Sequence, residues 1–338
     1  MPLPGWHLPG VMTAGAGQIL LKSAGMVPDG RLVLAGSGPL LLLVAWQYLQ
    51  AGVTIEALVD TTPGSRLFEA ISSLPRALPA ADYLFKGLTF LRAIRKARIP
   101  VFKNVNGLRA EGDESLESVC FNLGQEKAAN GPQVRIKADT LMLHQGVISN
   151  IRLPLAAGCK PVWDALQQNW KVATNKWGQT SVRQVMAVGD CAGIAGARVA
   201  ELQGRLCALQ LGYELRSIGP GRRDREARRI NRSLNRHLSI RPFIDKLYAP
   251  DKTYQLPENA TLVCRCEEIN AGQVREAARM GCVGPNQVKA FTRCGMGPCQ
   301  GCLCGSTVAA LVADETNIPI EEVGYFRVRP PFKPITLG

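Results

Sequence analysis

Two short apolar runs near the start of the chain are separated by a glycine turn and a long apolar segment. Residues 31–35 (RLVLA) predict a buried strand, and the following GSGPLLLLVAWQYLQAG predicts a tight turn and an apolar helix. Residues 53–59 predict a second strand that ends at Asp60. A strand, a glycine-rich turn, a helix and a strand ending in an acid form the unit that binds dinucleotides.

The residue types at this turn suit a phosphate-bearing ligand. Gly36 permits the tight turn, Ser37 follows it, and Gly38 lets the backbone approach a pyrophosphate at the positive end of the helix. Asp60 is placed to accept hydrogen bonds from ribose hydroxyls. The third small residue of the fingerprint is replaced by Leu41, whose side chain would interfere with close packing of helix on strand. NAD, ATP and a βαβ unit that binds nothing remain alternatives here.

A second strand, turn and helix are predicted over residues 185–209, with the strand at 185–188 and the helix at 193–209. An aspartate at such a strand end can accept hydrogen bonds from a ribityl hydroxyl. A helix that begins with small residues can lie against a flavin, where its dipole stabilises negative charge. The alternative is an ordinary strand–helix turn. The residues expected at this flavin edge are Gly189, Asp190, Gly193 and Ile194.

Composition restricts the class of protein. Of the 338 residues 46% are hydrophobic and 20% are charged, which favours folded domains over a disordered chain. No apolar run approaches the roughly 20 residues of a membrane span, and no signal peptide is evident, so we expect a cytoplasmic protein. Thiols stay reduced in that compartment, and clustered cysteines there indicate a metal site.

The net charge of +13 is concentrated in one segment. Residues 216–241 hold nine arginines against Asp224 and Glu226. A predicted helix over this segment presents either a solvated face or a surface for an acidic protein partner. Peripheral contact with the inner face of a membrane is the alternative. With few aromatic residues and no nucleic-acid-binding motif, we expect no nucleic-acid partner.

Seven of the eleven cysteines lie in the last quarter of the chain. Cys264 and Cys266 form a C-x-C pair, which two short predicted helices (271–280 and 285–291) separate from a glycine-rich loop with four more cysteines. Two thiolates from each of two loops make a four-thiolate site, which suits either zinc or an iron–sulfur cluster. The cysteines of the second loop are Cys294, Cys299, Cys302 and Cys304.

The segments LVLAGSGPLL, LMLHQG and AVGDCAGIAGA together resemble the two-dinucleotide-binding-domain flavoproteins. More narrowly, they resemble the FAD-bearing large subunits of opine oxidases, cyanide-forming glycine dehydrogenases and dye-linked (hydroxy)proline dehydrogenases. The tail, CGMGPCQGCLC, resembles the bacterioferritin-associated-ferredoxin-like (BFD-like) [2Fe–2S] domain. The resemblance implies an α/β, Rossmann-like flavoprotein fold with a small α-rich [2Fe–2S] domain. It also implies FAD and a cluster held by Cys264, Cys266, Cys299 and Cys304, with Cys302 and Cys294 as alternates.

The family opens with a first FAD-binding turn of the type GxGPAG, and no such turn precedes Gly36. We therefore expect this chain to lack the first half of its FAD domain and to keep only the Asp190 edge of the flavin site, which makes stable FAD binding by the chain alone doubtful. The expected organisation is a linker (1–30), a nucleotide-binding domain (31–122), the rest of the FAD domain (123–212), a basic connector (213–256) and the [2Fe–2S] domain with its tail (257–338).

The resemblance implies an oxidoreductase subunit of a hetero-oligomeric amino-acid, imino-acid or opine dehydrogenase. A second flavoprotein subunit would oxidise a C–N bond, and electrons would pass through the cluster to a quinone or dye, with a small ferredoxin-like subunit as a further partner. No residue of the chain is predicted to be catalytic, and we interpret His144 as a structural or flavin-edge residue. The alternatives are a self-contained NAD(P)H-dependent reductase of the cluster and an inactive remnant.

Overall fold

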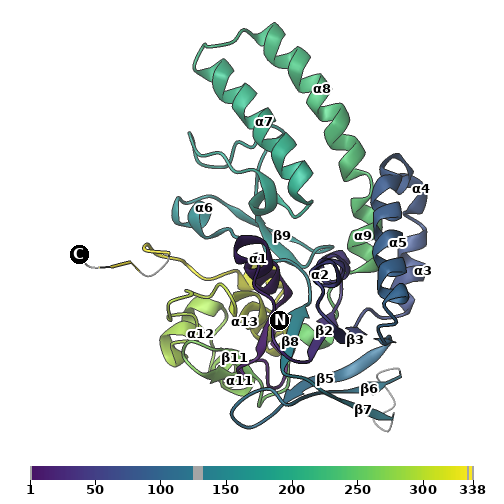
Figure 1. Ribbon diagram of the computed structural model, residues 1–338. Coiled ribbons are helices and arrows are strands. Elements are labelled where there is room, and N and C mark those ends of the chain that lie inside the picture. Colours follow the sequence, from purple (N-terminus) through teal and green to yellow (C-terminus); the bar gives the residue numbers. More distant parts are fainter. Residues whose placement is uncertain (1, 125–131, 333–334, 337–338) are drawn as a thin grey trace.

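The computed structural model describes residues 2–124, 132–332 and 335–336 and centres on a parallel sheet of five strands (Figure 1). Every residue of β2 and β8 in this sheet is buried, as their uninterrupted apolar sequences predict for parallel strands covered on both faces. In order across the sheet the strands are β1 (Val11–Thr13), β8 (Thr140–His144), β2 (Leu32–Gly36), β3 (Ile55–Asp60) and β4 (Val101–Phe102).

Helix α2 (Pro39–Gln50) joins β2 to β3 and contacts its neighbours α1 (Ala14–Ala24) and α5 (Ala81–Lys96). The βαβ unit predicted from the sequence is therefore present. Leu41 is only 2% exposed and packs in one cluster with Leu32 and Leu34 of β2. The expected interference is absent, because the large side chain fills the space between helix and sheet.

A second, antiparallel sheet follows, formed by β5 (Val105–Glu111), β6 (Ser118–Leu123) and β7 (Gln133–Lys137). Its first two strands, β5 and β6, pair as an antiparallel hairpin. The chain then returns to the parallel sheet as β8, between β1 and β2. The parallel sheet thus takes strands from both sides of position 122, where the sequence places a domain boundary; that division remains a prediction.

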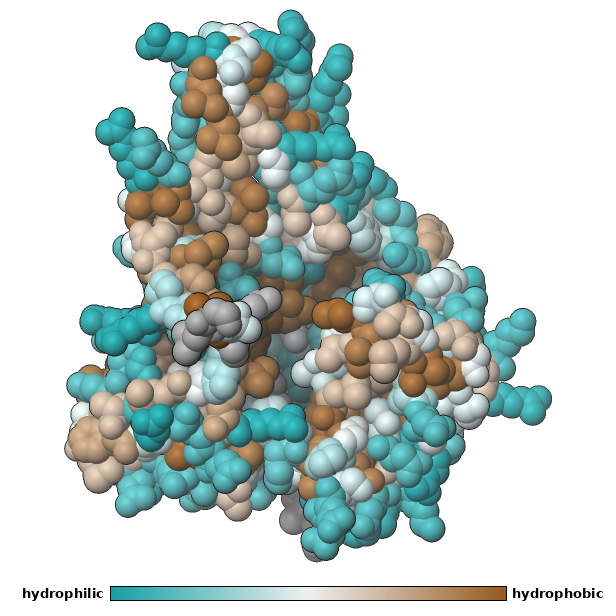
Figure 2. Space-filling view, turned by 60° about the vertical axis from the view of Figure 1, so that its left-hand side comes forward, coloured by the Kyte–Doolittle hydropathy of each residue, from teal (hydrophilic) through white to brown (hydrophobic). Residues whose placement is uncertain are grey.

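The next part of the chain contains a small hairpin and a projecting pair of helices. Strands β9 (Pro161–Asp164) and β10 (Asn169–Val172) pair after α6 (Arg152–Ala156), and the turn η2 (Gly189–Ala192) leads toward α7 (Ala197–Glu214). Helix α8 (Pro220–Leu238) packs back on α7, and the two project from the rest of the molecule (Figure 1). Figure 2 shows hydrophobic side chains along the projecting pair of helices, α7 and α8, and around a hollow below them.

Two predictions for the segment before α7 are wrong, the strand at 185–188 and the start of the helix at 193. Met186 forms a single bridge with Gln179, and α7 begins only at Ala197. The backbone between them includes Gly193 at φ +134° and Gly196 at φ +93°, conformations that a right-handed helix does not accommodate. The remaining short helices before the C-terminal module are α3 (Ser65–Ile71), α4 (Leu74–Ala77), η1 (Leu78–Ala80), α9 (Arg241–Leu247) and α10 (Lys252–Gln255).

The C-terminal module is small and largely helical, with its own hydrophobic core. Its first long helix begins with a capping box in which Asn270 and Gln273 exchange side-chain-to-backbone hydrogen bonds. The indole N–H of Trp6 donates to the Leu262 carbonyl at 2.6 Å and joins the module to the start of the chain. The elements are β11 (Leu262–Cys264), β12 (Ile269–Asn270), α11 (Ala271–Arg279), α12 (Pro285–Thr292), α13 (Gly305–Thr316) and α14 (Ile320–Val323).

None of the helices in the described part of the chain is both long and apolar enough to cross a membrane.

Candidate functional site

Three cysteines that are far apart in the sequence meet inside the C-terminal module. Cys264 ends β11, Cys294 follows α12, and Cys304 immediately precedes α13. Their sulfur atoms all lie within 4.8 Å of one another, and each residue is at most 1% exposed. The folds of both loops therefore converge on a buried group of thiols, which we call the inner thiols.

Cys266 and Cys299 form a second, outer pair. The backbone N–H and the side chain of Cys299 both reach the Cys266 sulfur, and Cys266 is exposed while Cys299 is half-buried. Burial raises the pKa of the Cys266 thiol, and its neighbours Cys299 and Cys264 raise it further. The four cysteines predicted as ligands thus fall into an inner pair and an outer pair. Of the two alternates, Cys294 is one of the inner thiols and Cys302 is exposed.

Glycines allow the second cysteine loop to close over the first. A Cβ at Gly297 would overlap the Cβ of Cys266. Gly295 and Gly301 have φ of +86° and +75°, and a Cβ at either would lie 2.6 or 2.5 Å from the ring of Phe326. Side chains at these positions would push the loop away from the thiols. The glycines noted in the sequence therefore have a direct packing role at this site.

Hydrogen bonds distribute charge unevenly among the inner thiols. Hydrogen bonds from the thiols of Cys294 and Cys304 lower the pKa of Cys264 to about 2, and backbone N–H groups of Gly295 and Glu267 contribute. The same contacts raise the pKa values of Cys294 and Cys304. An anionic sulfur with backbone N–H donors is the environment that thiolate-bound iron–sulfur clusters use. The donor set fits a four-thiolate group, either [2Fe–2S] or zinc.

The first glycine turn lies at the carboxyl end of the parallel sheet. The Ser37 N–H donates to the His144 carbonyl at 2.7 Å, and a Cβ at Gly36 would overlap that carbonyl. Gly36 is thus required by the approach of β8 to β2. Gly38 (φ +110°) precedes α2, and a Cβ there would lie 3.3 Å from Nε2 of His144.

Asp60 ends the neighbouring strand and lies at the same edge of the sheet. Its carboxylate accepts the Thr62 N–H at 2.9 Å, and Thr62 hydrogen bonds with Ser37. Burial, and then the charge of Asp60, raise the pKa of Tyr248 to about 12. Thr61, directly after Asp60, is one of the residues that line a cleft of ≈880 Å³. The four residues predicted at the nucleotide turn therefore lie together, at the edge where open α/β sheets bind their ligands.

The predicted flavin edge is held by side chains from two neighbouring elements. Gln167 donates to the Ile194 carbonyl at 2.7 Å and accepts its N–H at 3.1 Å. The Gly189 N–H donates to Gln203 of α7 at 2.8 Å. Asp190 is exposed and lies in the turn η2. Hydrogen bonds therefore fix the backbone at Gly189 and Ile194, while the Asp190 side chain is exposed to solvent.

A cavity of ≈140 Å³ is lined by residues from the glycine turn, the flavin edge and the cysteine module. Ser37, Gly38 and Ile194 contribute to its wall, as does Ser306 in the first turn of α13, two residues after Cys304. Asp60, Asp190 and Gly193 are not among its lining residues. The cavity brings the ends of three separate sequence motifs to one place.

Several polar groups of this cavity were not identified from the sequence. Gln145 Nε2, Gln168 Oε1 and Arg241 Nε are buried in its lining without a hydrogen-bond partner in the described structure. Burial lowers the pKa of His144 to about 4, so the imidazole is neutral at pH 7. Gln145 belongs to the LHQG segment, which was the one sequence motif that could have pointed to this cavity. Gln168 and Arg241 come from segments without a motif. Buried polar atoms are normally hydrogen-bonded, so a bound water or a polar ligand would complete these three.

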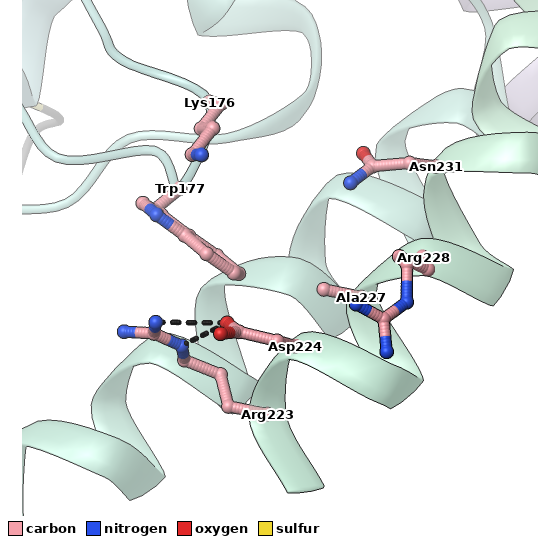
Figure 3. A pocket seen from close by; sticks show the side chains of 7 residues that line it. All are labelled: Lys176, Trp177, Arg223, Asp224, Ala227, Arg228 and Asn231. Carbon is pink, nitrogen blue, oxygen red and sulfur yellow. Dashed lines mark hydrogen bonds and ion pairs between the residues drawn. The ribbon is translucent and has the colours of Figure 1, made fainter. Parts of the chain in front are cut away.

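A separate open pocket of ≈300 Å³ lies between the 173–180 loop and α8 (Figure 3). The Arg223 guanidinium stacks 5.0 Å from the Trp177 ring and 4.2 Å from the Tyr213 ring, and it pairs with Asp224. Trp177 packs against the core of the α7–α8 hairpin. This pocket is a joint between loop and hairpin and contains none of the predicted site residues.

Two family models match the chain on either side of the basic connector. Residues 12–204 match the pyridine nucleotide-disulphide oxidoreductases, and residues 258–338 match the sarcosine oxidase A3 domain. The chain belongs to the pyridine nucleotide-disulphide oxidoreductase family. This membership confirms the predicted Rossmann-like flavoprotein fold and the assignment to the oxidoreductases.

Curated relatives narrow the resemblance within this family. The chain is 41% identical over 339 residues to an opine oxidase subunit of Rhizobium meliloti (strain 1021), covering all of the chain and 72% of the relative. It is 40% identical to the corresponding opine oxidase subunit of Agrobacterium tumefaciens (strain Ach5), of which it covers 66%. It is 30% identical to the hydrogen cyanide synthase subunit HcnB of Pseudomonas aeruginosa, covering 72%. The predicted resemblance to opine oxidase and cyanide-forming subunits is confirmed.

Among solved structures, the L-proline dehydrogenase from P. horikoshii has a similar fold, with a TM-score of 0.65 and 17% identity. The match covers all of this chain and 55% of that one. The family implies binding of FAD or another nucleotide, and the cysteine group is compatible with an iron–sulfur site.

Proposed function

We propose that the chain is the electron-transfer, flavin-type subunit of a hetero-oligomeric amino-acid, imino-acid or opine dehydrogenase. A partner subunit oxidises the substrate C–N bond, and electrons pass by way of a [2Fe–2S] centre to a quinone-like or dye acceptor. The observation that carries the proposal is the cavity shared by the glycine turn, the flavin edge and the start of α13 beside Cys304. The relatives' names as subunits of an oxidase and a synthase support a partner.

Cys264, Cys304, Cys266 and Cys299 hold the cluster in this proposal, as the inner and outer pairs described above. A [2Fe–2S] centre, when bound, accepts and releases one electron at a time. The protein supplies backbone N–H groups to the Cys264 sulfur and a loop of glycines that excludes bulky side chains. The N–H groups stabilise negative charge on the Cys264 sulfur, and the glycines let the loop approach it.

The other cofactors of the proposal are nucleotides. Gly36, Ser37, Gly38 and Asp60 would hold an adenine nucleotide, beside the cleft that Thr61 lines. FAD lies against Gly189, Asp190, Gly193 and Ile194. Nε2 of Gln145, which has no hydrogen-bond partner among the described residues, is available to a polar group in the cavity.

Helix α8 is the proposed contact with the partner. Its exposed residues Arg225, Arg229 and Arg232 repeat at intervals of four and three and form one positive stripe. Such a stripe favours an acidic protein surface. The proposed location is the cytoplasm, with at most a peripheral contact with the inner face of the membrane.

One observation favours a second function, a self-contained NAD(P)H-dependent reductase. The dinucleotide-type turn at Gly38 and the α13 residue Ser306 line the same cavity, so donor and cluster sites adjoin within one chain. In that case the chain reduces its own cluster without a partner. An inactive remnant that retains the cluster is a third alternative.

Anaerobic mixing of the purified chain with reductants distinguishes these functions. We expect NADH and NADPH alone to leave the visible absorption of the oxidised cluster unchanged. Addition of the co-expressed partner flavoprotein and an opine or imino acid should bleach it. Bleaching by NADH without the partner would establish the reductase, and oxidation of the substrate at full rate by the chain alone would contradict the role of the partner.

A further inference from the structure

The inner side of the cysteine site holds one thiol more than a cluster requires. A [2Fe–2S] centre takes four thiolates, two on each iron. The outer pair, Cys266 and Cys299, supplies two. The inner side offers three, because the Cys294 sulfur lies within 4.8 Å of both Cys264 and Cys304.

Cys294 is held in place independently of its two neighbours. Its backbone N–H donates to the Thr292 hydroxyl at 3.1 Å, at the end of α12, where Arg293 has a left-handed backbone with φ of +62°. Cys304 precedes α13, and the N–H of Val308 in that helix donates to its carbonyl at 2.8 Å. Loss of one of these side chains therefore need not displace the other.

The surroundings of Cys294 keep water away from its sulfur, so that water does not compete with it as a metal ligand. The residue is fully buried in the core of the module, together with Val288, Val308 and Phe326. Its sulfur forms hydrogen bonds with the other two inner thiols. An unligated thiol in this position is neutral and apolar enough to remain buried. A metal ion bound to Cys264 is within reach of either remaining sulfur.

From this geometry we propose that Cys294 is an alternative ligand of the cluster, able to take the position of Cys304. The proposal rests on the iron–sulfur function proposed above. In the exchange one bond from iron to the Cys304 sulfur breaks and one bond to the Cys294 sulfur forms. A proton passes from the Cys294 thiol to the Cys304 thiolate, and no electron is transferred.

Alanine variants test this exchange through the metal content of the full chain purified without oxygen. The readouts are iron and acid-labile sulfide per chain, together with the visible circular dichroism spectrum. Cys304→Ala should retain more than half of the wild-type iron with a changed spectrum, and Cys294→Ala should retain nearly all of it. The double variant should lose the cluster. Cys282→Ala, which removes a buried cysteine of the same core outside the inner thiols, is the matched control.

A Cys304→Ala variant as poor in iron as the double variant, while Cys282→Ala keeps its cluster, would overturn the proposal. If Cys304→Ala does not fold, Cys304→Ser preserves the side-chain volume and is measured with and without Cys294→Ala. Equal iron in those two proteins would also overturn it. A wild-type chain without iron would refute the proposed function itself, which is a different outcome.

Discussion

At the scale of single residues, the cysteine loop depends on positions where no side chain fits. Gly297 is buried, and an added methyl group would meet the Cβ of Cys266, which is fixed by its own backbone. The neighbouring atom is not the mobile end of a long side chain. Relief of the overlap therefore requires movement of one of the two loops.

Gly297→Ala should therefore lower the cluster content of the purified chain severalfold and destabilise the module by about 1–3 kcal/mol. Iron analysis and thermal unfolding measure the two effects. Gly204→Ala is the control, because an added Cβ in that helical position of α7 meets nothing within 4 Å. It should leave iron unchanged and stabilise α7 slightly. A Gly297→Ala protein with wild-type iron would contradict the packing account.

His144 makes the stability of the first part dependent on pH. Burial lowers its pKa from 6.5 to about 4, so the unfolded chain binds more protons than the folded chain between these values. The free energy of unfolding should be highest above pH 6.5 and should fall by about 3 kcal/mol as the pH decreases to 4. Denaturant titrations at several pH values measure this decrease.

His144→Gln should flatten the pH dependence over that range, since the amide does not titrate. His7→Gln is the matched control, because His7 is exposed. The carboxylates contribute equally to the pH dependence of both variants. The difference between the two pH profiles therefore reports the contribution of His144. Identical pH profiles for the two variants would refute the assignment.

The sequence predicted the roles of single residues where the types of residue in a segment are enough to indicate its chemistry. The cysteine and glycine content of the second loop indicated a thiolate site, and the structure brings Cys294 and Cys304 of that loop together with Cys264. The sequence did not reveal that a side chain at Gly36 would collide with the carbonyl of His144. That contact joins strands separated by more than a hundred residues. The selection of Cys294 as an inner thiol likewise depends on the tertiary fold.

At the scale of elements, one arginine connects α6 to the cysteine loop. The Arg152 guanidinium donates to the carbonyls of Cys299 and Phe332, both at 3.2 Å. It thereby fixes the part of the loop that carries an outer-pair cysteine. A hydrogen bond from a charged donor contributes about 1.5–3 kcal/mol, and the Cys299 carbonyl also accepts the Cys302 N–H at 3.0 Å.

Arg152→Ala should leave the fold intact and accelerate the loss of iron to a chelator severalfold, because the Cys299 segment is freed from its neighbour. Chelation kinetics followed by absorption provide the measurement. Lys160→Ala removes an exposed cation nearby in sequence and should have no effect. Equal rates of iron loss in the two variants would show that the connection is unimportant.

The elements predicted most accurately were those with an uninterrupted apolar pattern. Strands β2 and β3 and helix α2 were all found close to their expected positions. The segment 185–196 was misassigned, because its glycines adopt left-handed conformations that the apolar pattern does not report. The shared cavity was not predictable, since its wall includes Arg241 and Tyr248 of a segment interpreted only as a basic connector.

At the scale of the whole molecule, the cysteine module and the parallel sheet have separate hydrophobic cores. A metal group that closes the cysteine loops stabilises the module to which it binds. Removal of iron should therefore destabilise residues 262–312 and leave β2, β3 and β8 unaffected.

Hydrogen exchange measured by mass spectrometry distinguishes these regions. Amides of α11, α12 and α13 should exchange faster in the iron-depleted chain, while those of the parallel sheet keep their protection. Uniform acceleration over the whole chain would contradict two separate cores. Unchanged exchange in the module would show that its fold does not depend on the metal.

The central claim is that the chain carries a four-thiolate [2Fe–2S] centre for electron transfer. The most direct test is metal and sulfide analysis of the full chain, purified without oxygen, together with its visible spectrum before and after dithionite. The account predicts a coloured protein with about two irons and two acid-labile sulfides per chain, bleached on reduction. A colourless protein with about one zinc per chain and no sulfide would contradict it.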